Sequence, residues 1–127
     1  MFLLDTHTFL WYAAADPNLP QKITEIISKA DSVCLSVVSL WEIAIKQSLN
    51  KMTYTDSIVE LGEVCKQLDI QILGLDLHTI EHIKNLPFIH KDPFDRMLVA
   101  QAQEKNLTII TKDRMIPQYE ISTLTFE

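Results

Sequence analysis

Short apolar runs alternate along the chain with longer stretches in which apolar residues recur every three or four positions. An apolar run bounded by polar or turn residues is typical of a strand buried on both faces, whereas the longer spacing is typical of a helix with one buried face. The pattern therefore predicts strands at residues 2–5, 32–37, 70–75 and 107–111, with a short edge strand at 119–124. It predicts helices at residues 6–15, 20–30, 39–48, 55–68, 76–86 and 93–105.

This order of elements predicts a three-layer α/β/α domain, because continuous apolar strands separated by helices form a parallel sheet covered on both faces. The expected sheet is twisted, mainly parallel and built of about five strands. A length of 127 residues is typical of one domain, and such a chain buries enough surface to fold without disulfides or structural metals. Trp11, Trp41, Phe94 and the isoleucines are expected in the core.

Four acidic residues stand where a predicted strand ends or the next helix begins, namely Asp5, Glu42, Asp95 and Asp113. The carboxyl ends of parallel strands lie at one edge of a sheet, and ligands bind in the crevice outside that edge. We therefore expect the four side chains to converge. Carboxylates brought together repel one another unless a cation lies among them, and Mg²⁺ or Mn²⁺ prefers such oxygen ligands. The chemical hypothesis is metal-assisted cleavage of a phosphodiester bond.

Each of these acids also has a purely structural interpretation. Asp is a favoured N-cap residue, so Asp5 and Asp113 could do no more than begin a helix. The spacing of Ser39 and Glu42 fits a capping box, in which the Glu side chain bonds the amide of the N-cap residue. Against that interpretation, Lys46 follows Glu42 by four residues and lies on the same helix face.

The helix start at residue 93 assigns different roles to two neighbouring acids. Asp92 is the expected N-cap and Pro93 the first helical residue. Asp95 could then do no more than complement the helix dipole, but with Asp92 as the cap it is also free to point into the crevice. The histidines form no zinc-binding pattern, and His7 is a minor site candidate because it lies close to Asp5. The four histidines are His7, His78, His82 and His90. With only two glycines, the chain has no glycine-rich phosphate loop.

The net charge of −6 argues against simple nucleic-acid binding, which normally requires a basic surface. Part of that charge belongs to the expected site, because setting the four acids aside leaves 13 acids against 11 bases. Five basic residues lie within four positions of one of the acids: Lys46, Lys91, Arg96, Lys112 and Arg114. A basic rim is thus expected, with Lys46, Arg96, Lys112 and Arg114 as candidate contacts to RNA phosphates.

The composition suits a protein of the cytoplasm. Cys34 and Cys65 have no metal-ligand spacing, and two isolated thiols fit a reducing compartment. We expect no membrane segment and no signal peptide, because Asp5, Thr6 and His7 interrupt the first apolar run and no basic leader precedes it.

Taken together, these segments resemble a PIN domain, and specifically the VapC-type toxin ribonucleases of bacterial toxin–antitoxin pairs. The resemblance covers nearly the whole chain, which we expect to be one PIN domain of residues 1–127, and it is carried by the motifs at residues 3–11, 36–46, 92–102 and 107–113. It implies an endoribonuclease dependent on Mg²⁺ or Mn²⁺, a homodimer, a cognate antitoxin as partner, and tRNA or another structured RNA as substrate. The family's acids match Asp5, Glu42, Asp95 and Asp113, and its flanking hydroxyls match Thr6 and Thr111.

Three alternatives remain. A catalytically silent PIN-like module would bind RNA or protein and use its acids only as helix caps, and metal binding distinguishes it from a nuclease. A phosphoacceptor receiver domain requires an acidic pair after its first strand, whereas Thr6 follows Asp5. A haloacid-dehalogenase-type phosphatase requires Asp-x-Asp, and His7 occupies the second position.

Overall fold

The computed structural model describes residues 1–127 and contains one five-stranded sheet in the order β3-β2-β1-β4-β5. Every neighbouring pair of strands is parallel, which confirms the predicted α/β architecture. The strands are β1 (Phe2–Leu4), β2 (Val33–Ser36), β3 (Ile70–Leu73), β4 (Thr108–Thr111) and β5 (Ser122–Thr125). The chain builds β1, β2 and β3 outward in one direction and then crosses to β4 and β5 on the other side of β1. The strand order therefore reverses between β1 and β4, which makes this pair the topological switch point of the sheet. In open sheets ligands bind at such a point, outside the carboxyl ends of the strands.

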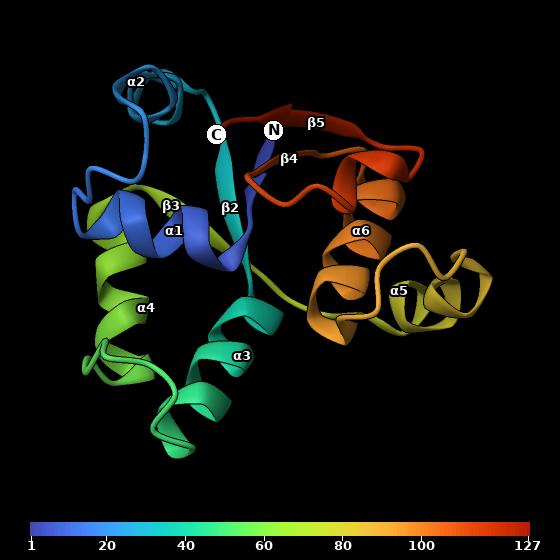
Figure 1. Cartoon of the computed structure of the whole chain (residues 1–127), viewed down its shortest axis with the longest axis horizontal. Helices are drawn as coiled ribbons and strands as arrows, with labels where there is room; N and C mark the ends of the chain where they lie inside the picture. Colours follow the sequence, from blue (N-terminus) through green and yellow to red (C-terminus); the bar gives the residue numbers. More distant parts are fainter.

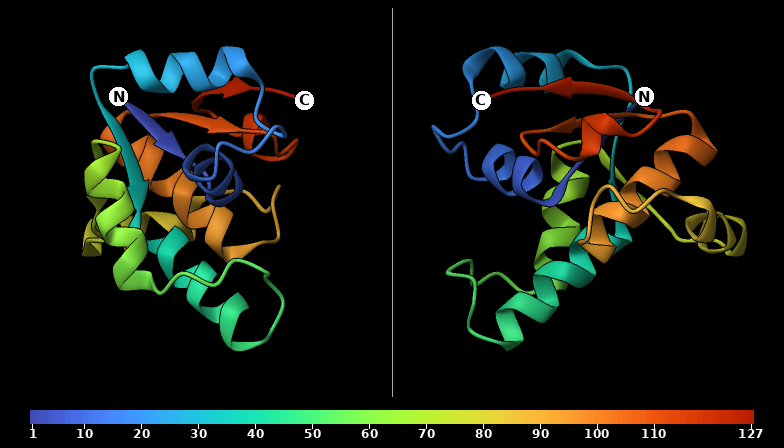
Figure 2. Two further views of the ribbon diagram at one scale, coloured as in Figure 1. Left: turned by 90° about the vertical axis from the view of Figure 1, so that its left-hand side faces the viewer. Right: turned by 45° about the vertical axis from the view of Figure 1, so that its right-hand side comes forward.

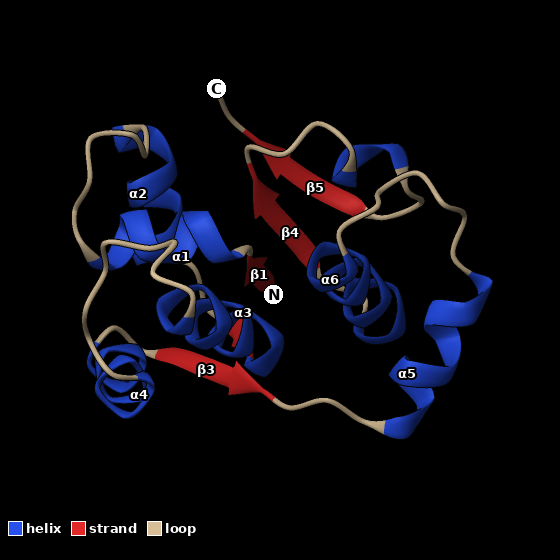
Figure 3. Ribbon diagram, turned by 60° about the horizontal axis from the view of Figure 1, so that its bottom comes forward, coloured by secondary structure: helices blue, strands red, loops and turns tan.

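Helices cover both faces of this sheet (Figure 1). They are α1 (Thr6–Ala13), α2 (Gln21–Lys29), α3 (Val37–Ser48), α4 (Ile58–Gln67), α5 (Leu77–His82) and α6 (Pro93–Lys105), with 3₁₀ turns at Ile83–Asn85 and Ile116–Gln118. Figure 3 shows α1, α2 and α4 on one side and α5 and α6 on the other. The helices are too short or too polar for any of them to span a lipid bilayer.

Two apolar cores lie on the two faces because successive strand residues point in opposite directions. Leu4 contributes to the core that α1 to α4 cover, whereas its neighbour Leu3 contributes to the core beneath α6. On β4, Ile110 contributes to the core under α1 to α4 and Ile109 to the core beneath α6. This packing fixes the register of β1 beside β4, and it brings the residues after these two strands to the same edge of the sheet.

Some sequence predictions were wrong in detail. The helix expected at residue 39 begins at Val37, because the Ser36 hydroxyl caps it by accepting a hydrogen bond from the Val38 amide at 3.0 Å. The helix expected at residue 55 begins at Ile58, after a capping box formed by Ser57 and Glu60.

The core prediction failed for Trp41, whose exposed fraction is 60%, and Ile72 and Ile80 are exposed as well. Phe94 and Trp11 are half-buried. Figure 2 shows that α3 extends beyond the edge of the sheet. The Trp41 ring on this helix packs against that of Phe94 on α6, at 5.2 Å between centroids, and the rest of its surface is exposed.

Candidate active site

Asp5 directly follows β1, where it caps helix α1 and lines the same cavity as the other acids. Its Oδ1 atom accepts a hydrogen bond from the Thr8 amide at 2.9 Å, which makes it the N-cap of α1. Its Oδ2 atom accepts a hydrogen bond from the Thr111 hydroxyl of β4. Burial raises the pKa of Asp5 above its ordinary value, although the hydrogen bonds from Thr111 and Thr8 oppose the rise. The capping role is therefore real but uses only one of the two oxygens.

Glu42 is buried on α3 and caps no helix. Its Oε1 atom accepts a hydrogen bond from the Thr6 hydroxyl at 2.7 Å, and its Oε2 atom lies 2.7 Å from Nζ of Lys46. The Thr6 hydroxyl also lies 3.0 Å from that of Ser39. The capping-box interpretation is wrong, because Ser36 already caps this helix, and Thr6 instead joins the start of α1 to α3.

Asp95 is free of the capping role, as its position predicted. Asp92 caps α6 by accepting from the amides of Phe94 at 2.8 Å and Asp95 at 3.4 Å. Burial, followed by the charge of Asp92, raises the pKa of Asp95 to about 7, and His90 opposes the rise. Asp5 and Asp113 raise this pKa further, so the three carboxylates repel one another through space.

Asp113 follows β4 and divides its two oxygens as Asp5 does. Oδ1 accepts from the amides of Met115 at 2.7 Å and Ile116 at 3.0 Å, and Oδ2 lies 3.0 Å from Nε2 of His90. Burial pushes the pKa of Asp113 upward, but the hydrogen bonds from Ile116, His90 and Met115 outweigh it and leave a lowered pKa. The Asp113 amide donates to the Thr111 hydroxyl at 2.9 Å, so Thr111 bridges Asp5 and Asp113.

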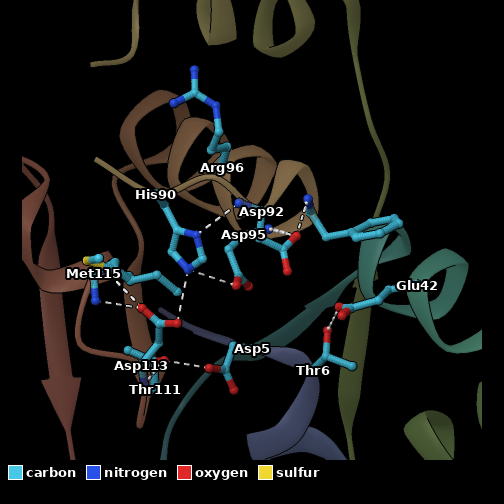
Figure 4. Close-up of polar contacts among 12 residues, drawn as sticks. Asp5, Thr6, Glu42, His90, Asp92, Asp95, Arg96, Thr111, Asp113 and Met115 are labelled. Carbon is cyan, nitrogen blue, oxygen red and sulfur yellow. Dashed lines mark hydrogen bonds and ion pairs between the residues drawn. The ribbon is translucent and has the colours of Figure 1, made fainter. Parts of the chain in front are cut away.

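His90 is the site residue that the sequence analysis missed. Its Nε2 atom lies 3.1 Å from Oδ2 of Asp95 and 3.0 Å from Oδ2 of Asp113 (Figure 4). It belongs to an irregular loop, where no periodicity marks the direction of a side chain. The one available signal was its place two residues before the Asp92 cap and five before Asp95.

The four predicted acids line one cavity of about 480 Å³. Thr6, Lys46 and Lys112 of the predicted residues line it too, and so does His90. The exposed His7 also reaches this cavity, where its ring stacks against Trp11 at 5.6 Å between centroids. Thr111 is fully buried and supports the cavity from behind Asp5.

The basic rim differs from the prediction at Arg96. Its side chain is buried and points away from the acids (Figure 4), where it donates to the carbonyl of Pro87 at 3.0 Å and to the Tyr119 hydroxyl at 3.3 Å. Weaker bonds reach the carbonyls of Ile83 and Leu86. The prediction that Arg96 contacts RNA is therefore wrong, because its guanidinium is already occupied by loop carbonyls.

Arg114 lines a neighbouring cavity of about 510 Å³, which shares Lys112 and Asp113 with the acidic one. The basic side chains at the acidic cavity itself are therefore Lys46 and Lys112, and Arg114 extends the positive charge to one side.

The donor set fits a hard divalent cation. One potential ligand atom from each of His90, Asp95 and Asp113 lies within 4.8 Å of the other two. Carboxylate oxygens are the ligands that Mg²⁺ and Mn²⁺ prefer. A cation at this site would offset the burial that raises the pKa values of Asp5 and Asp95, and also the carboxylate repulsion that adds to the rise at Asp95.

Comparison with known proteins gives concordant results. The model of the PIN domain family matches residues 2–121. Ribonuclease VapC22 of Mycobacterium tuberculosis is 24% identical over 116 residues, covering 90% of this chain and 88% of that protein. Among solved structures, DNA-bound VapBC from Salmonella typhimurium matches with a TM-score of 0.67 and 20% identity, covering 98% of this chain and 96% of the other. FitAcB from Neisseria gonorrhoeae matches with a TM-score of 0.65 and 19% identity, covering 98% and 97%. The chain therefore belongs to the PIN-domain family, as its motifs predicted.

Proposed function

We propose that this protein is a metal-dependent endoribonuclease of the VapC type, which hydrolyses phosphodiester bonds in RNA. The observation that carries the proposal is the convergence of Asp5, Glu42, Asp95 and Asp113 in one cavity from four separate segments. Backbone amides bond one carboxylate oxygen of Asp5 and one of Asp113, which leaves the second oxygen of each free for another role. Helix capping does not account for the positions of Glu42 and Asp95. Membership of the PIN family and the similarity to Ribonuclease VapC22 support the same activity.

In this proposal Asp5 and Asp95 are the principal metal ligands, and Glu42 and Asp113 complete the site directly or through water. One or two bound Mg²⁺ or Mn²⁺ ions would polarise the scissile phosphate and lower the pKa of a water molecule. The protein's own residues hold these carboxylates in place, with Thr111 on Asp5 and Thr6 on Glu42.

In this proposal Lys46 and Lys112 hold phosphates of the RNA near the cleaved bond. Both side chains line the acidic cavity, and Arg114 lines the adjoining one. Such contacts orient a nucleic acid without reading its sequence. The substrate that we propose is tRNA or another structured RNA, because unpaired loops expose the backbone and bases that proteins recognise.

A cognate antitoxin and a second copy of the chain are the proposed protein partners. The support comes from the VapC-type resemblance and from the likeness of the fold to VapBC from Salmonella typhimurium and to VapBC2 from Rickettsia felis, which has a TM-score of 0.65. Equilibrium sedimentation of the isolated chain measures its oligomeric state.

The first test is a Mn²⁺ titration monitored by water-proton relaxation, which needs no knowledge of the RNA target. The variant is Asp95→Asn, and the control is Asp76→Asn, which replaces an acid that caps α5 outside the site. We expect saturable binding by the wild type and the control, and loss of binding in Asp95→Asn. In the presence of Mg²⁺, the wild type and the control should cleave total tRNA, whereas Asp95→Asn should not. EDTA should stop the cleavage.

A folded wild type that binds no Mn²⁺ would overturn the proposal and favour the catalytically silent binding module. Wild-type rates of tRNA cleavage by Asp95→Asn would remove Asp95 from the site. Circular dichroism of each variant separates a lost site from a lost fold.

A further inference from the structure

His90 lies between two acids of the proposed metal site, and two roles are open to its imidazole. Nε2 lies 3.0 Å from Oδ2 of Asp113 and 3.1 Å from Oδ2 of Asp95. A histidine that binds a metal through Nε2 needs a lone pair on that atom, whereas one that donates to a carboxylate needs a proton there. The protonation of Nε2 therefore decides which role is possible.

The other ring nitrogen answers this question. Nδ1 of His90 lies 3.1 Å from the backbone nitrogen of Asp92, which donates its hydrogen to it (Figure 4). An atom that accepts from an N–H group carries a lone pair and no proton, so the proton of a neutral imidazole must be on Nε2. Nε2 is then a donor, and it faces two carboxylate oxygens.

We infer that His90 is a positioning residue for the metal site and not a metal ligand. Its Nε2–H group donates to Asp113 and lies against Asp95, and so holds together two carboxylates that would otherwise repel each other. This role rests on the proposed function, because it is the metal-binding role of these two acids that gives the contact its purpose.

Asp95 depends on this contact more than Asp113 does. The amides of Met115 and Ile116 already hold Oδ1 of Asp113, whereas His90 is the one partner of the Asp95 carboxylate. Oδ1 of Asp95 makes no hydrogen bond, so it remains available to a cation while Oδ2 lies against the Nε2–H group of His90. Groups that orient metal ligands in this way typically contribute about 10- to 100-fold to metal affinity.

The backbone of His90 is itself held from outside the site. Its amide donates to the Tyr119 hydroxyl at 2.9 Å, and that hydroxyl donates to the Pro87 carbonyl at 2.9 Å. Arg96 donates to both the Tyr119 hydroxyl and the Pro87 carbonyl. The arginine that does not reach RNA thus anchors the loop that carries His90.

The direct test is the tautomer of His90 in the metal-free protein, read from long-range ¹H–¹⁵N correlations above pH about 8, where ordinary imidazoles are neutral. We expect the proton on Nε2 and a lone pair on Nδ1. The exposed His78 is the internal reference for a ring without such constraint. A proton on Nδ1 would overturn the inference whether or not the protein binds metal.

The second test compares His90→Ala and His90→Gln in the Mn²⁺ titration, because Gln retains an N–H donor and Ala does not. His90→Ala should weaken binding by about tenfold or more, and His90→Gln should restore most of the loss. The control is His82→Ala, which removes a ring that contacts Gln103 and Glu104 outside the site. Electron spin-echo modulation of bound Mn²⁺ should show no directly coordinated imidazole nitrogen.

The outcomes separate the two proposals. Wild-type affinity in His90→Ala, or a coordinated nitrogen that both His90 variants lose, would overturn the positioning role while leaving the metal site intact. A wild type that binds no Mn²⁺ would remove the proposed function, and the tautomer measurement would still decide the state of His90.

Discussion

The Tyr119 hydroxyl accepts a hydrogen bond from the His90 amide at 2.9 Å and thereby joins the end of the 3₁₀ turn after β4 to the loop that precedes α6. The same hydroxyl donates to the Pro87 carbonyl and accepts from Arg96, so its hydrogen-bonding capacity is fully used. The geometry of the acidic cavity therefore depends on residues that do not line it.

Tyr119→Phe should lower the free energy of unfolding by about 1–3 kcal/mol, because the Pro87 carbonyl and the His90 amide lose a buried partner. The control is Tyr54→Phe, which removes a half-buried hydroxyl bonded only to Asp56 and should cost less than about 1 kcal/mol. Urea unfolding measures both. Equal losses in the two variants would contradict the prediction.

Thr111→Val should weaken Mn²⁺ binding by about 10-fold or more, because the valine is similar in shape but leaves the Asp5 carboxylate without its hydroxyl donor. The matched control is Thr108→Val on the same strand, whose hydroxyl bonds the exposed Ser122. That control should bind Mn²⁺ like the wild type. An unchanged affinity in Thr111→Val would show that Asp5 does not need this contact.

The stability of the metal-free protein should fall as the pH rises toward 7, because of Asp95. Its pKa is about 7 in the folded protein against 3.8 ordinarily, so between these values the unfolded carboxyl loses a proton that the folded one retains. The protonated Asp95 carboxyl therefore makes its full contribution to stability below about pH 4, and this contribution is lost as the pH rises through about 7. Asp95→Asn cannot ionise, so its stability relative to the wild type should rise over that interval by on the order of 2 kcal/mol or more.

Urea unfolding in EDTA between about pH 5 and 8 measures this difference. The control is Asp76→Asn, because the pKa of Asp76 is lowered to about 2 by hydrogen bonds from the Thr79 amide and Lys105. The contribution of Asp76 is lost only in acid, so its variant should keep a constant difference from the wild type over this range. A difference for Asp95→Asn that does not change with pH would refute the prediction.

Lys46→Gln should destabilise the metal-free protein by about 1–2 kcal/mol, because it leaves a buried Glu42 oxygen without its cation. Lys84→Gln breaks an ion pair with Glu81 that has a similar N–O distance but in which both side chains are exposed. It should therefore cost less than about 0.5 kcal/mol. Thermal unfolding measures both variants. Excess Mn²⁺ should reduce the cost of Lys46→Gln if Glu42 faces the bound ion, and identical losses in both variants would count against a buried carboxylate.

The four acids could be predicted from the sequence because apolar runs show where strands end. Leu4 and Thr111 are strand residues, so Asp5 and Asp113 follow two neighbouring strands at the same edge. The Asp92 cap was equally visible, since Asp before Pro is a strong helix start. Local rules suffice where the decisive contacts are close in sequence.

His90, Arg96 and Trp41 could not be predicted because their environments depend on tertiary packing. The partners of Arg96 are carbonyls of residues 83–87, whose position follows from the path of a loop. Trp41 is apolar and helical, yet its ring packs against that of Phe94 on α6 and the rest of its surface is exposed. Residue type and periodicity contain no information on either arrangement.

In both Asp5 and Asp113, one carboxylate oxygen bonds backbone amides and the other faces the site. This arrangement affects how a loss of activity would be recognised in related chains. Both residues serve folding as well as chemistry, so selection for stability alone would retain them after catalysis had disappeared. Glu42 and Asp95 cap nothing, and burial without a cation disfavours the charge of Asp95. In an inactive descendant these two would drift first. Their replacement, and not the persistence of Asp5 or Asp113, would mark a PIN domain that has become a pseudoenzyme.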